Sequence, residues 1–74
     1  NITESLTRAE AILASAGVPN PRVDAELLVG HVLGLSRGGV QAKVATDAAL
    51  SPDDAVTIGE LVELFVNRIF SSQP

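Results

Sequence analysis

The sequence predicts an all-α fold, a small orthogonal bundle of four to five helices with no sheet. Apolar residues recur at spacings of three and four over several segments, and residues typical of helix starts and stops separate those segments. No run alternates with a period of two or gathers β-branched and aromatic residues, so no strand is expected. With 74 residues the chain is expected to form a single domain, residues 1–74, in which residues 71–74 begin a linker.

The first helix is predicted over residues 4–16, with Thr3 as its N-cap. Its apolar side carries Leu6, Ala9, Leu13 and Ala16. Gly17 suits the left-handed residue just past a helix end, and Val18 is expected to fold back onto Leu13. The connection that follows is short, which predicts an antiparallel or steeply crossed hairpin with the next helix.

The second helix is predicted over residues 21–33. Asn20 is its expected N-cap, and Pro21 is tolerated at the first helical position because its missing N–H would be unpaired there. Gly34 is expected to end the helix. The apolar side is predicted to consist of Val23, Ala25, Leu27, Leu28 and Val32.

A third, shorter helix is predicted over residues 37–44, with Ser36 as its cap. Gly38 and Gly39 weaken it, since glycine costs about 1 kcal/mol relative to alanine inside a helix, and we expect it to be mobile. Residues 45–50 fit either a loop or a single helical turn.

The last helix is predicted over residues 52–70 and is the longest. Ser51 is its expected N-cap, followed by a proline and two acidic residues. One stripe is formed by Ile58, Leu61, Val62, Phe65 and Ile69. Leu64, Val66 and Phe70 lie off this stripe and either fill the core or face a neighbour. We expect Phe70 or Val66 to be partly exposed and to contact a following domain or a second copy of the chain.

The composition excludes several classes of function. The formal net charge is −4 and the five basic residues are scattered, so a direct nucleic-acid partner is not expected. Without cysteine, and with one histidine, neither a disulfide framework nor a zinc site is expected. No apolar run is long enough to span a membrane and no signal peptide is evident, so a cytoplasmic location is expected.

The candidate site residues of the sequence are docking residues. No nucleophile–base–acid set and no glycine-rich phosphate loop occurs, so we predict no catalytic, cofactor-binding or metal-binding residue. Arg22 and Glu26 are spaced to pair along one helix, and Asp24 suits the helix N-terminus. Arg22 and Asp24 are either such local stabilisers or part of a docking surface. Arg37 either bonds to the last carbonyls of the second helix or docks a partner. His31 is interpreted as a half-buried structural residue.

A resemblance adds to this interpretation, and it is densest over residues 16–37. It is carried by Ala16-Gly17, Pro21-Arg22, Asp24-Ala25-Glu26-Leu27-Leu28, His31, Leu33-Gly34 and Ser36-Arg37. In order and spacing these residues resemble the N-terminal helical domain of the release factor glutamine methyltransferases, the HemK/PrmC family. Arg68 and Pro74 match the end of that domain, whereas Ile69 and Phe70 stand where the family usually has basic or polar residues.

The resemblance implies a function that composition alone does not. In that family a Rossmann-like domain follows and transfers a methyl group from S-adenosylmethionine to the glutamine of the GGQ motif in class 1 peptide release factors. This chain would then be the non-catalytic, substrate-engaging domain. Its implied partners are a release factor and its own C-terminal catalytic domain, and the cofactor would belong to that second domain.

Acyl carrier proteins are also short, acidic and helical, but they carry a serine in an Asp-Ser-Leu setting at the start of the second helix, where this chain has Asn20-Pro21-Arg22. The alternative that stays open is a free-standing helical interaction domain that dimerises through its last helix.

Overall fold

The computed structural model describes residues 1–71, which form four α-helices and contain no strand. The helices are α1 (Ile2–Ser15), α2 (Pro21–Leu33), α3 (Arg37–Ala45) and α4 (Pro52–Ser71). The predicted all-α class is therefore confirmed. Residues 45–50, which fitted a loop or a helical turn, contribute only the last residue of α3 and otherwise connect α3 to α4.

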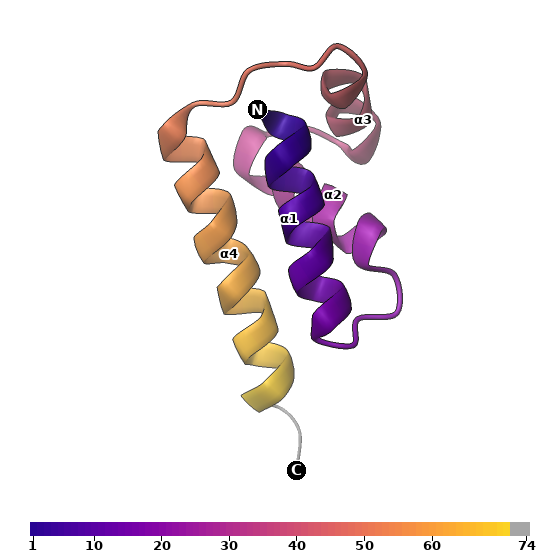
Figure 1. The fold of residues 1–74 in the computed structure, drawn as a ribbon, viewed down its shortest axis with the longest axis vertical. Helices are drawn as coiled ribbons and strands as arrows, with labels where there is room; N and C mark the ends of the chain where they lie inside the picture. The colour runs from indigo at the N-terminus through magenta and orange to yellow at the C-terminus, as the bar shows by residue number, and fades with distance from the viewer. Residues whose placement is uncertain (72–74) are drawn as a thin grey trace.

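The helices pack around α1 (Figure 1). α1 and α4 lie side by side and run in the same direction, α2 crosses behind α1, and α3 covers the end of the bundle at which the chain begins. All four helices contribute to one core of nine buried apolar residues. These are Ile2, Leu6, Ala9, Leu13, Ala25, Val29, Val40, Ile58 and Val62.

The start of α1 differs from the prediction, because Asn1 and not Thr3 is the N-cap. The Asn1 side-chain oxygen accepts a hydrogen bond of 3.0 Å from the backbone N–H of Glu4. Both residue types can cap a helix. The earlier start draws Ile2 into the first turn, where it becomes one of the best-buried residues of the chain.

The predicted helix stops around α2 are confirmed. Gly17 has a φ of +85°, and the N–H of Val18 donates to the carbonyl of Leu13 over 3.1 Å. Gly34 has a φ of +70°, and the N–H of Leu35 donates to a carbonyl in the last turn of α2. In both places a glycine takes a left-handed conformation that a Cβ would disfavour, and an apolar residue folds back on the helix that has just ended.

The start and the buried side of α2 correct two predictions. Asn20 occupies the N-cap position, but its side chain makes no capping hydrogen bond. The buried residues of α2 are Ala25, Glu26, Val29 and Gly30. Of the predicted apolar side only Ala25 is fully buried, and Leu27 is 53% exposed. The helix is thus rotated so that Gly30 faces inward, where its missing Cβ leaves room for the carbonyl oxygen of Leu35.

The caps of α3 and α4 agree with the sequence. The Ser36 hydroxyl accepts from the N–H of Gly39 over 3.1 Å, and the Ser51 hydroxyl accepts from the N–H of Asp54 over 3.1 Å. The helices extend one residue further than predicted, to Ala45 and Ser71. Ser71, expected in the linker, is therefore helical, and the rest of the expected linker, residues 72–74, lies outside the described residues.

Candidate docking site

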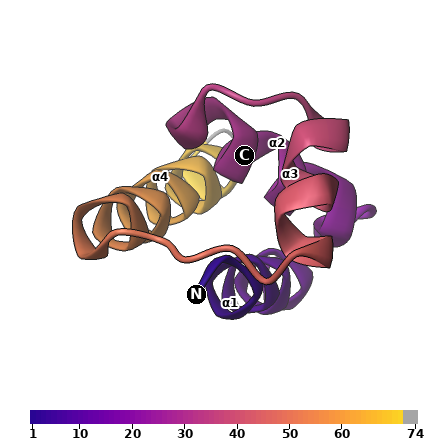
Figure 2. The ribbon, with the colours of Figure 1, turned by 90° about the horizontal axis from the view of Figure 1, so that it is seen from above.

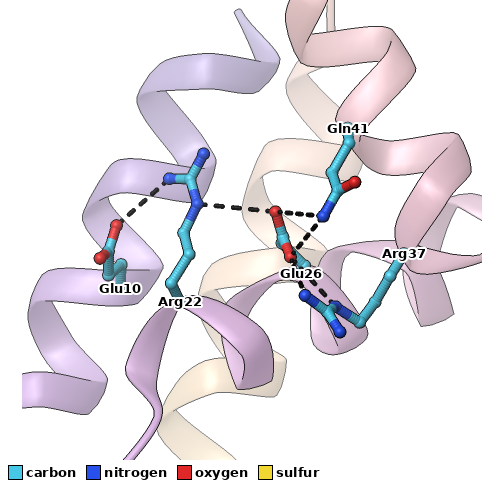
Figure 3. A network of polar contacts seen from close by, with 5 residues as sticks. All are labelled: Glu10, Arg22, Glu26, Arg37 and Gln41. Atoms are coloured by element: carbon cyan, nitrogen blue, oxygen red, sulfur yellow. Dashed lines mark hydrogen bonds and ion pairs between the residues drawn. The ribbon is translucent and has the colours of Figure 1, made fainter.

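A buried carboxylate organises the polar side of the bundle (Figure 3). Glu26 is 3% exposed, and its carboxylate receives side chains from two helices. Arg37 Nε donates to Glu26 Oε1 over 3.1 Å, and Gln41 Nε2 donates to both carboxylate oxygens over 3.2 and 3.3 Å. Arg22 Nε lies 3.6 Å from Glu26 Oε2, and Arg22 Nη1 donates to Glu10 over 3.2 Å. We call these five residues the Glu26 cluster.

The Glu26 cluster joins three helices. Glu10 comes from α1, Arg22 and Glu26 from α2, and Arg37 and Gln41 from α3. Burying an unpaired carboxylate would be costly, but here two guanidinium groups and an amide compensate it. The arginine side chains keep 45% and 42% of their surface in solvent, so their charges are only partly desolvated. The cluster therefore fixes α3 and α1 against α2 while presenting two arginines at the surface.

The structure brings two of the predicted site residues together. The predicted pair of Arg22 with Glu26 is confirmed, and Arg37, for which two roles were open, binds the same carboxylate. The sequence reasoning missed the burial of Glu26 and the contribution of Gln41. The spacing of Arg22 and Glu26 was the only available signal, because the contacts from α3 depend on how that helix packs.

Asp24 lies apart from the Glu26 cluster. Its position in α2, three residues before Leu27 and seven before His31, places the three on one side of the helix. Asp24 is half-buried, while Leu27 and His31 are exposed. The interpretation of His31 as half-buried is therefore wrong.

The other predicted docking residues, Val66 and Phe70, lie on α4, which contributes nothing to the Glu26 cluster. Val66 is half-buried against the core and Phe70 is 56% exposed. The reason is visible in Figure 1, in which the last turn of α4 extends beyond the end of α1. The predicted exposure of Phe70 is confirmed, and its contact with a partner stays a prediction. Leu64 is equally exposed and Val56 more so, at 62%.

The described surface is also hollowed away from these residues. One hollow has a volume of about 320 Å³ and lies near the start of α1, with Lys43 and Asp54 among otherwise mainly apolar lining residues. Another, of about 30 Å³, lies between α1 and α4. Within residues 1–71 no three histidine or acidic side chains are grouped so as to hold a metal ion. None of the four described helices combines the length and apolar content that a membrane crossing requires.

The comparisons with known proteins agree with this picture. A family model described as the PrmC N-terminal domain matches residues 4–69. A release factor glutamine methyltransferase of Rhodospirillum rubrum is 44% identical over 57 residues, which are 77% of this chain and 17% of that protein. Proteins of the same name from Deinococcus radiodurans and Mycolicibacterium smegmatis are 58% and 56% identical over 36 and 34 residues, 49% and 46% of this chain.

The extent of these matches defines what they show. The aligned segments cover 13% and 12% of the Deinococcus and Mycolicibacterium proteins, so the chain spans a small part of the curated relatives it matches. No solved structure matches the chain significantly. The family model nevertheless covers nearly the whole chain, including both glycine helix stops and the Glu26 cluster. This chain therefore belongs to the PrmC N-terminal domain family.

Proposed function

We propose that this chain is the substrate-engaging domain of a protein-(glutamine-N5) methyltransferase that modifies the GGQ glutamine of class 1 peptide release factors. The family match over residues 4–69 carries the proposal, since the relatives are named release factor glutamine methyltransferases. The domain itself is non-catalytic. Its helices provide a folded surface, with Arg22 and Arg37 at one place and Phe70 at another, for binding a protein substrate in the cytoplasm.

The proposed division of labour can be tested with the full-length enzyme and a variant that lacks residues 1–71. Methyl transfer is measured on two substrates, the intact release factor and a short peptide that contains its GGQ sequence. A substrate-engaging domain improves binding to surfaces remote from the reacting glutamine. Its deletion is therefore expected to raise KM for the intact protein at least about tenfold and to leave transfer to the peptide unchanged.

The same experiment separates the alternatives. An equal loss of methyl-transfer activity on the intact release factor and on the peptide would mean that the domain supports the catalytic domain instead of engaging the substrate. An unchanged KM for the intact release factor would contradict the proposal. Binding of S-adenosylmethionine to the truncated enzyme, measured by calorimetry, is the control that the remaining part is folded.

The cofactor site is assigned to the catalytic domain of the parent enzyme. S-adenosylmethionine sites of the Rossmann-like kind need a sheet with a glycine-containing loop at its carboxyl edge, and residues 1–71 of this chain contain no strand. Calorimetric titration of the 74-residue chain with S-adenosylmethionine is expected to give no binding heat. Micromolar affinity would contradict this assignment.

A free-standing domain that dimerises through α4 is the second candidate, because Val56, Leu64 and Phe70 leave apolar surface in solvent along that helix. Analytical ultracentrifugation of the 74-residue chain decides between a monomer, which the docking proposal expects, and a dimer that Phe70→Ser dissociates.

A further inference from the structure

We draw no further inference here: the strongest candidate, the hollow of about 320 Å³ at the end of the bundle where the connection between α3 and α4 passes the start of α1 (Figure 2), carries nothing because its charged lining residues, Lys43 and Asp54, are of opposite sign and nothing in the structure shows what covers it.

Discussion

α2 and α4 depart from the usual burial of residues in opposite ways. α2 contacts each of the other three helices, and it buries a carboxylate, Glu26, and a glycine, Gly30. α4 contacts only α1 and α2 among the described helices, and it leaves three large apolar side chains exposed, Val56, Leu64 and Phe70, where α2 leaves one, Leu27. In a helix that contacts three others, a buried charge needs partners from those helices, as Glu26 has, and a close backbone contact needs a glycine, as at Gly30. A helix that is covered on one side can leave apolar side chains exposed. We therefore propose that a partner, if one binds, contacts α4.

The strongest test of the closed region is Gly30→Ala. The added Cβ would lie 2.4 Å from the backbone carbonyl oxygen of Leu35, and neither the helix nor the turn after it can move without disturbing the core. We expect a loss of about 3 kcal/mol in the free energy of unfolding, the upper part of the range for overpacking. Urea denaturation measures it. A loss below about 0.5 kcal/mol would show that α2 is not tightly held at this point.

The next largest effect is expected at the Glu26 cluster. Arg37→Met removes a charged hydrogen bond of 3.1 Å from a carboxylate that stays buried, which should cost about 2 kcal/mol. Arg22→Met is the matched control and should cost about 1 kcal/mol or less, because its contact with Glu26 is longer, at 3.6 Å, and its hydrogen bond to Glu10 joins two side chains that are more than a third exposed. Equal costs in urea denaturation would contradict the larger role assigned to Arg37 in compensating the Glu26 carboxylate.

A smaller difference in stability is expected between two helix N-caps, Ser51 of α4 and Asn20 of α2. Ser51→Ala removes the hydroxyl that accepts from the Asp54 N–H and is expected to cost about 1 kcal/mol. Asn20→Ala, at a cap position whose side chain makes no such bond, should cost a few tenths of a kcal/mol, less than the value of about 1 kcal/mol typical of an asparagine cap. Thermal unfolding of both variants checks this order, and a reversed order would contradict the assigned caps.

The smallest effect on stability is expected at the open end of α4. Phe70→Ser changes a side chain in the last turn of α4 that is already 56% exposed, so the free energy of unfolding of the chain should change by less than about 0.5 kcal/mol. A cost of several kcal/mol would make Phe70 a core residue and remove the contrast between α2 and α4.

The sequence predicted those features that depend on neighbouring residues. The left-handed Gly17 and Gly34 and the capping hydroxyls of Ser36 and Ser51 lie where the sequence indicated, because each is decided within one turn of chain. The exposure of Phe70 was also predicted, since its position at the end of a broad apolar side is a local property.

Apart from the N-caps of α1 and α2, where the chain offered more than one local choice or the side chain made no bond, the features that were not predicted depend on packing between helices. Glu26 was interpreted as a residue of a helix start, and its burial follows from Arg37 and Gln41, which reach it from α3. Leu27 was placed on the buried side because it is apolar, but Gly30 offers the closer approach and decides which side faces inward. The predicted docking role of Arg22, Asp24 and Arg37 stays a prediction.

The pairing of α1 with α4 has a consequence for how the chain folds and opens. Short connections, residues 16–20, 34–36 and 46–51, join all four helices, but the contact between α1 and α4 joins segments that are separated by all of residues 16–51. Closing that longer loop costs more chain entropy, so α4 is expected to dock last and to open first. Amide protons near Phe70 should therefore exchange with solvent fastest and those near Val29 slowest, in the order that hydrogen-exchange mass spectrometry or NMR can measure. The helix with the most exposed large apolar side chains is thus also the one whose ordering a bound partner would most strongly reinforce.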